Sequence, residues 1–201
     1  MYHADATVLA DIDKKFEQFI RGIGISKEIA LNDYALAPLS SRRDMAMLGV
    51  IHRAALGKGP EQIQKFFVKE CNSTHAHGRN ALRRHKWQLQ TYRKGNFLQR
   101  TRNSIFGLID IYNLLPVEVV QREEVHSFQT ELQALLKVHA RTGELGWEML
   151  FSPRLELHNH PLRRLLNRVS TTHDGTWTMD DGGMITPEVV APLRDMPPSW
   201  W

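Results

Sequence analysis

The sequence of 201 residues predicts an all-α fold, in which a helical module of five or six helices (residues 1–165) precedes a mostly irregular tail (residues 166–201). Two observations predict this class. Apolar residues recur at spacings of three and four along most of the first part, which is the period of an amphipathic helix. The tail is rich in Gly, Pro, Asp and Thr, which favour turns. We therefore expect one weak hairpin at most there, and otherwise a mobile segment.

Glycine and serine divide the first helices. Residues 5–21 form one amphipathic helix, and Gly22 and Gly24 end it. Ser26 is a candidate N-cap for a short second helix, SKEIALNDY, because its hydroxyl can accept from a free amide of the first turn. The stripe that we expect to be buried on the first helix consists of Val8, Leu9, Ile12, Phe16, Phe19 and Ile20.

A central helix follows within residues 36–60, where so few positions are polar that the helix should be buried nearly all round. Ser41 and Asp44 resemble a capping box near its start. Gly57 fits its C-terminal end, and Pro60 begins the next helix, PEQIQKFFVKE. The buried face predicted for that next helix consists of Ile63, Phe66 and Phe67.

Three more helical segments complete the module. Residues 79–94 are compatible with a helix that packs on one side and presents cations on the other. The apolar run at 105–115 has a polar residue at every third position, so we expect a mostly buried helix that Ser104 caps and Pro116 ends. Residues 124–141 form a last amphipathic helix. The polar members of the apolar run are Gly107, Asp110 and Asn113.

The basic character of the chain lies in one block. The net charge is +4, but no Asp or Glu occurs from Cys71 through Ile109, and eight basic residues lie from Arg79 to Arg102. The rest of the chain contains 18 basic residues (26 − 8) and 22 acidic ones, so its net charge is −4. Such a block is typical of a site for a polyanion, most often nucleic acid; the alternative is a solvated helix face paired with the acidic remainder. The predicted nucleic-acid-binding residues are Arg79, Arg83, Arg84, Lys86, Trp87, Arg93, Lys94, Arg100 and Arg102.

Aromatic residues alternate with these cations, as in proteins that bind single-stranded nucleic acid. Trp87 is either a stacking platform or a core anchor, and the sequence leaves both open. We assign Phe106 to the core.

Other chemistries have weaker support. Cys71, His75 and His77 cluster, and His158 and His160 form a second pair. A structural zinc site needs four ligands and usually two or more cysteines, so polar-loop histidines are the favoured interpretation. Asp180 and Asp181 are adjacent, as in polymerase palms, but no strand-rich palm precedes them and an exposed turn is favoured. There is no nucleophile signature and no glycine-rich phosphate loop. We assign no catalytic residue, metal or cofactor.

The chain is expected to be soluble and intracellular, in the nucleus or the cytoplasm. Its single cysteine rules out an internal disulfide framework, and its N-terminus lacks a signal-peptide pattern. The run at 105–115 is far shorter than the ~20 residues of a membrane span, so no membrane association is predicted.

Two stretches in order resemble a known family. LAPLSSRRDMAMLGVIHRAALGKGPEQIQKFF and SIFGLIDIYNLLPVEVVQREEVHSFQTEL are similar to the C-terminal, post-palm region of non-LTR (LINE-like) retrotransposon reverse transcriptases. The similarity covers roughly residues 5–140. The pattern in the second stretch rests on Tyr112, Asn113, Leu115, Pro116, Ser127 and Phe128.

The resemblance implies a helical region that helps to hold template RNA or target DNA. Tyr112 departs from the family, which usually has Trp there, and the catalytic palm, the endonuclease and the Cys-rich knuckle are absent. We therefore expect no enzyme activity, but a non-catalytic remnant of an RNA-directed DNA polymerase. Its expected partners are the RNA or DNA backbone and other domains of a parent polymerase. The alternative is a structural or protein-interaction module with no nucleic-acid role.

Overall fold

The computed structural model describes residues 6–69, 85–91, 101–102, 104–163, 169–171, 177–179 and 184–185. The chain divides into two compact units, residues 1–163 and 164–201. The first unit is helical, which confirms the predicted all-α class. Its described elements are α1 (Ala6–Gly22), α2 (Lys27–Tyr34), α3 (Leu39–Ala55), α4 (Glu61–Gln64), α6 (Gly107–Asn113), α7 (Val117–Val120), α8 (Val125–Arg141) and the 3₁₀ turns η1 (Trp147–Met149) and η2 (Leu157–Asn159).

The second unit contains a small antiparallel sheet where we expected one hairpin at most. Strands β1 (Val169–Thr171), β2 (Trp177–Met179) and β3 (Met184–Ile185) pair in the order β1-β2-β3. Val169 lies opposite Met179, and Trp177 opposite Ile185. β-branched and aromatic residues occur in these short strands, and such residues favour extended structure between the turn-forming glycines and aspartates.

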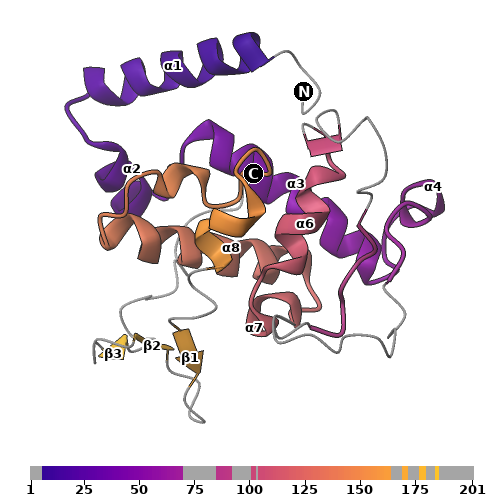
Figure 1. Ribbon diagram of the computed structural model, residues 1–201. Helices are drawn as coiled ribbons and strands as arrows, with labels where there is room; N and C mark the ends of the chain where they lie inside the picture. Colours follow the sequence, from indigo (N-terminus) through magenta and orange to yellow (C-terminus); the bar gives the residue numbers. More distant parts are fainter. Residues whose placement is uncertain are drawn as a thin grey trace. The chain divides into compact units, whose positions relative to one another are not determined.

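Helix α3 occupies the centre of the first unit, as predicted from its apolar sequence. It packs against α8 and α6, and also contacts α1, α4 and η1 (Figure 1). Gly49 allows the close approach of α8, because a Cβ there would lie 2.6 Å from Nε2 of Gln129 and 3.3 Å from Cγ1 of Val125. Leu48 and Ile51 of α3 are fully buried.

The structure confirms one predicted cap and corrects another. The amide of Ile29 donates to Oγ of Ser26 at 3.2 Å, so Ser26 is the N-cap of α2. Ser41 is not a cap, because α3 already begins at Leu39. Ser41 is instead fully buried, and its hydroxyl donates to the carbonyl of Glu148 at 2.7 Å.

Only part of the predicted stripe on α1 is buried. Leu9 and Ile20 are buried, but Phe19 is 60% exposed, and Val8 and Ile12 are exposed as well. The prediction of one fully buried stripe is therefore wrong. The pattern shows only that a helix is amphipathic; how wide a face its neighbours cover depends on the tertiary packing.

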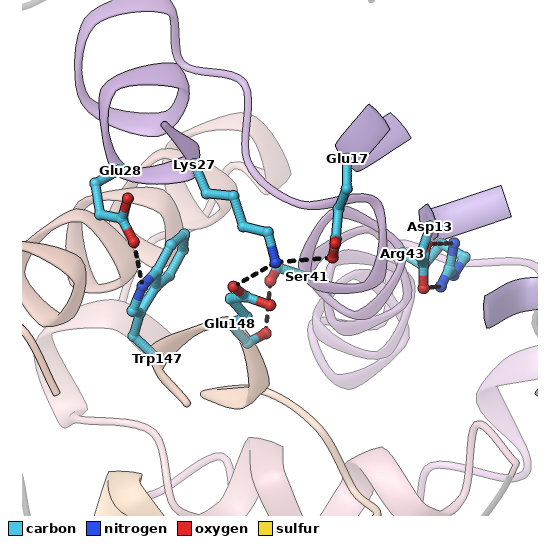
Figure 2. Close-up of polar contacts among 8 residues, drawn as sticks. All are labelled: Asp13, Glu17, Lys27, Glu28, Ser41, Arg43, Trp147 and Glu148. Atoms are coloured by element: carbon cyan, nitrogen blue, oxygen red, sulfur yellow. Dashed lines mark hydrogen bonds and ion pairs between the residues drawn. The ribbon is translucent and has the colours of Figure 1, made fainter. Parts of the chain in front are cut away.

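Ion pairs also hold α1 against the core (Figure 2). Arg43 of α3 donates to both carboxylate oxygens of Asp13, at 2.9 and 2.7 Å. Lys27 lies between Glu17 and Glu148 and donates to them at 2.7 and 2.9 Å. Burial alone lowers the pKa of Lys27, but its bonds to the two carboxylates outweigh burial and raise this pKa above its ordinary value. These pairs tie α1 to α2, α3 and η1.

Helix α6 is shorter than the helix predicted from the apolar run, but it is as buried as expected. It begins at Gly107, and Phe106 is its N-cap, so Ser104 is not the cap; the Ser104 hydroxyl instead accepts from the amide of Phe106 at 3.2 Å. The helix ends at Asn113, ahead of Pro116. Its fully buried side chains are Leu108, Ile109, Ile111 and Tyr112.

The helix predicted after Pro60 is a single turn. Helix α4 ends at Gln64, and a turn at Lys65 and Phe66 follows it. Phe67 is buried, but Phe66 is 44% exposed, so the predicted shared buried face is wrong. Further along the chain, Lys69 pairs with Leu89 in an antiparallel bridge.

Candidate nucleic-acid interface

Three of the nine predicted nucleic-acid-binding residues lie in the part of the chain that the structure describes: Lys86, Trp87 and Arg102. The other six, Arg79, Arg83, Arg84, Arg93, Lys94 and Arg100, lie outside the described residues.

Residues 85–91, here called the docked segment, are not helical, which corrects the prediction of a helix at 79–94 for this part. The amide of Gln90 donates to the carbonyl of Val68 at 2.9 Å, and Leu89 pairs with Lys69. These bonds are of the β type, and they replace the bonds that a helix would make within itself. The amphipathic spacing of this part of the sequence therefore did not decide its conformation.

Asn113 fastens the docked segment to α6. Its amide nitrogen donates to the carbonyl of Leu89 at 2.8 Å, and its Oδ1 accepts from the amide of Leu89 at 2.9 Å. The Leu89 side chain is fully buried. His85 adds a further bond, because its Nε2 lies 3.2 Å from the carbonyl of Tyr112, which can only accept. The docked segment is thus held at both ends of its described length.

Two lysines gather around the ring of Trp87. Nζ of Lys69 lies 4.1 Å from the ring centroid, and Nζ of Lys86 lies 5.2 Å from it. Both lysines are exposed, while Trp87 is half-buried with its indole Nε1 inside, where it has no hydrogen-bond partner among the described residues. Such cation–π contacts hold ammonium groups over an aromatic face. Trp87 therefore brings two positive charges together, rather than offering an uncovered stacking face.

Lys65 and Lys69 extend this surface, although they were not among the predicted nucleic-acid-binding residues. Both lie before the acid-free stretch that defined the basic block. Nζ of Lys65 lies 5.1 Å from the ring centroid of Phe66. Two lysines flank two phenylalanines in the sequence KFFVK at 65–69, and that signal could have identified the pair.

Arg102 lies close to α6. A Cβ at Gly107 would collide with the backbone of Arg102, so this approach requires glycine. Phe106, which we predicted to be core, is half-buried. Its ring contacts Phe66 and Phe67 at centroid distances of 6.0 and 6.3 Å. Of the described residues of the basic block, Arg102 thus lies beside α6, and the docked segment pairs with residues 68–69.

A buried polar network lies beneath the docked segment. The carbonyl of Arg122 can only accept, so Nε2 of His52 donates to it at 2.6 Å. Nδ1 of His52 then accepts from the hydroxyl of Tyr112 at 3.0 Å. Burial lowers the pKa of His52 and of His85, and it raises the pKa of Tyr112 well above its ordinary value. All three groups are held neutral, which suits a structural role.

The burial of His52 and His85 predicts that the fold is less stable in acid. Burial lowers the pKa of His52 and His85 from 6.5 in the folded chain, so below that pH the unfolded chain binds protons that the folded chain does not. The free energy of unfolding is therefore highest above about pH 6.5. It falls as the pH drops toward the folded-state pKa, by up to about 1.4 kcal/mol per pH unit for each histidine. Urea unfolding at several pH values from about 7 to 5 measures this slope. The slope should be shallower in His52→Gln, and an unchanged slope would contradict the assignment.

The other sequence candidates do not form a site among the described residues. Cys71, His75, His77, Asp180 and Asp181 lie outside them. His158 is exposed and lies 3.3 Å from a carboxylate oxygen of Glu156. His160 is buried, and its two ring nitrogens pair with the carbonyl of Ser152 and the amide of Leu162. In the described ranges, no three His, Cys, Asp or Glu side chains come together as metal ligands.

A small hollow lies beside α1, lined by Phe16, Ile20, Lys27, Leu36 and Leu39 among others. Its cavity volume of about 20 Å³ has room for about one water molecule. A hollow of this size does not hold a small-molecule substrate, for which pockets of roughly 300–1,000 Å³ are usual.

Among the helices that the structure describes, none combines the length and the apolarity that crossing a bilayer requires.

Comparison with protein-family models, with curated proteins and with solved structures finds no match to this chain.

Proposed function

We propose that the chain is a non-catalytic helical module that binds RNA or DNA through the phosphate backbone. The contacts come from the basic block at 79–102 together with Lys65 and Lys69. The observation that carries the proposal is the placement of Lys69 and Lys86 around Trp87. Lys86 and Trp87 belong to the acid-free stretch 71–109, and Lys69 precedes it. Two ammonium groups near one ring attract an anion more strongly than either does alone. A phosphodiester is the anion that also suits the many arginines of the block.

The resemblance to the post-palm region of non-LTR reverse transcriptases supports the same proposal. Such a remnant of an RNA-directed DNA polymerase would hold nucleic acid without acting on it. Of the residues that carry the resemblance, Tyr112 and Phe128 are buried in the core, and Asn113 is half-buried and bonds to the docked segment. These residues would therefore position the binding surface rather than touch the ligand.

A second candidate is a structural or protein-interaction module, and α1 favours it. Val8, Ile12 and Phe19 are each at least 41% exposed, and their spacing places them along one side of the helix. An apolar stripe of this kind suits a partner protein or another domain of a parent polymerase.

The test is binding of a labelled mixed-sequence oligonucleotide by the 201-residue chain at low salt. The triple variant Arg83→Glu, Lys86→Glu, Arg93→Glu should lose binding, because three positive charges at the proposed phosphate contacts become negative. Reversal of Lys14 and Lys15, two exposed lysines of α1, is the control and should change affinity little. If the wild-type chain has no affinity for RNA or DNA at low salt, nucleic-acid binding is wrong and the interaction module is the better proposal.

A further inference from the structure

His85 lies at the start of the docked segment, and its side chain is buried. Its ring meets that of Tyr112 edge to face, at a centroid distance of 5.6 Å and an interplanar angle of 89°. Nε2 of His85 lies 3.2 Å from the carbonyl of Tyr112, which can only accept, so the ring proton is on Nε2. In the neutral ring, Nδ1 of His85 therefore carries no proton.

Nδ1 of His85 is enclosed, and it has no hydrogen-bond partner among the residues that the structure describes. The groups that act on the charge of this ring are Tyr112 on α6 and His52 on α3, and neither is an anion at neutral pH. The carboxylates of these two helices, Asp110 and Asp44, do not contribute to the pKa of His85. A proton on Nδ1 would thus be a buried charge without a counter-ion among the described residues.

The docked segment can leave α6 without opening the helical core, because α3 packs directly against α6 and α8. Besides the bond of His85, the described hydrogen bonds that join the segment to the rest of the chain are few. They are the two bonds between Leu89 and Asn113 and the bond from the amide of Gln90 to the carbonyl of Val68. Segments with few such bonds open more readily than the core beneath them.

We propose that His85 makes the docking of residues 85–91 sensitive to pH: when Nδ1 takes up a proton from solvent, the segment leaves α6 while α3, α6 and α8 stay packed. Release separates Lys86 and Trp87 from Lys69. Both lysines are cations, so they do not compensate the charge of a protonated ring. The inference goes beyond the proposed function, because it concerns the position of the segment whatever ligand binds there.

The direction of the effect follows from burial, which lowers the pKa of His85 in the docked state. His52 lowers this pKa further, and the bond to the carbonyl of Tyr112 opposes the shift. In the released segment the ring is in water, where the pKa of histidine is about 6.5. Docking is therefore most stable above about pH 6.5, and its equilibrium constant falls below that pH by up to about tenfold per pH unit.

The experiment is amide hydrogen exchange of the 201-residue chain from about pH 7 to 5.5, with each rate corrected for the exchange rate of an unstructured chain at the same pH. We expect the protection of the Leu89 and Gln90 amides to fall by up to about tenfold per pH unit below about pH 6.5. The amide of Leu132, in the buried face of α8, should remain at least about tenfold better protected at pH 5.5, because the core is still packed.

His85→Gln tests the role of the ring itself. The glutamine amide can still donate to the carbonyl of Tyr112, but it does not titrate. In this variant the protection of Leu89 and Gln90 should be nearly independent of pH, whatever its absolute value. His158→Gln is the matched control, since His158 is exposed, and it should keep the pH dependence of wild type.

Three outcomes would overturn the inference. The first is protection of Leu89 and Gln90 that does not change between pH 7 and 5.5 in wild type. The second is equal protection of these amides and of Leu132 at every pH, which would mean that the segment opens only when the whole fold does. The third is an unchanged pH dependence in His85→Gln. None of them bears on nucleic-acid binding, which the oligonucleotide titration tests separately.

Discussion

Phe128→Ala is expected to lower the free energy of unfolding by about 3–5 kcal/mol. The Phe128 side chain of α8 is fully buried, and its ring stacks on His52 of α3 at a centroid distance of 4.0 Å and an interplanar angle of 9°. It also lies 6.2 Å from the ring of Tyr112 on α6. The truncation leaves a cavity where three helices meet, and it removes the face that holds the His52 ring. Urea unfolding at neutral pH measures the loss.

Phe19→Ala is the matched control, since it removes the same atoms from a side chain that is 60% exposed. It should cost less than about 1 kcal/mol. Similar losses in the two variants would contradict the assignment of Phe128 to the centre of the core.

Asn113→Ala is expected to lower the free energy of unfolding by about 2 kcal/mol and to loosen the docked segment. Asn113 makes both hydrogen bonds to the backbone of Leu89, and alanine can make neither. The amide and the carbonyl of Leu89 then have no side-chain partner, although the Leu89 side chain is buried. Amide hydrogen exchange at Leu89 and Gln90 should become faster than in wild type.

Because the docked segment carries Lys86 and Trp87, Asn113→Ala should also weaken the binding of nucleic acid. Asn159→Ala is the control: Asn159 is exposed, and its truncation should change stability by less than about 0.5 kcal/mol. If exchange at residues 85–91 were unchanged in Asn113→Ala, the amide of Asn113 would not be what holds the segment.

The sequence predicted those parts of the fold that local chemistry decides. Ser26 caps α2, Gly57 adopts the left-handed conformation just after α3, and the polar stripe of 105–115 correctly indicated a buried helix. Each depends on interactions within a few residues. In contrast, Ser41 was predicted as a cap, but its hydroxyl bonds to Glu148, 107 residues away. No local pattern contains such a contact.

The candidate interface was only partly predicted, because some of its contacts are also long-range. The absence of acidic residues located the basic block in the sequence. The neighbourhood of Lys69, Trp87 and Lys86 depends on the pairing of Lys69 with Leu89 and on the side chain of Asn113. Asn113 looked like one polar member of a helix stripe, and the helical spacing around Leu89 suggested the wrong conformation. Long-range backbone hydrogen bonds outweighed that local preference.

Salt dependence of binding tests the proposed phosphate contacts most directly. The affinity of the 201-residue chain for a single-stranded oligonucleotide is measured from about 50 to 200 mM salt. If about five phosphates are neutralised, the logarithm of the association constant should fall with the logarithm of the salt concentration at a slope of about −3.5. The slope should become shallower by about 1.5 in the Lys69→Glu, Lys86→Glu variant. A slope near zero, or no affinity at the lowest salt concentration, would contradict binding through the phosphate backbone.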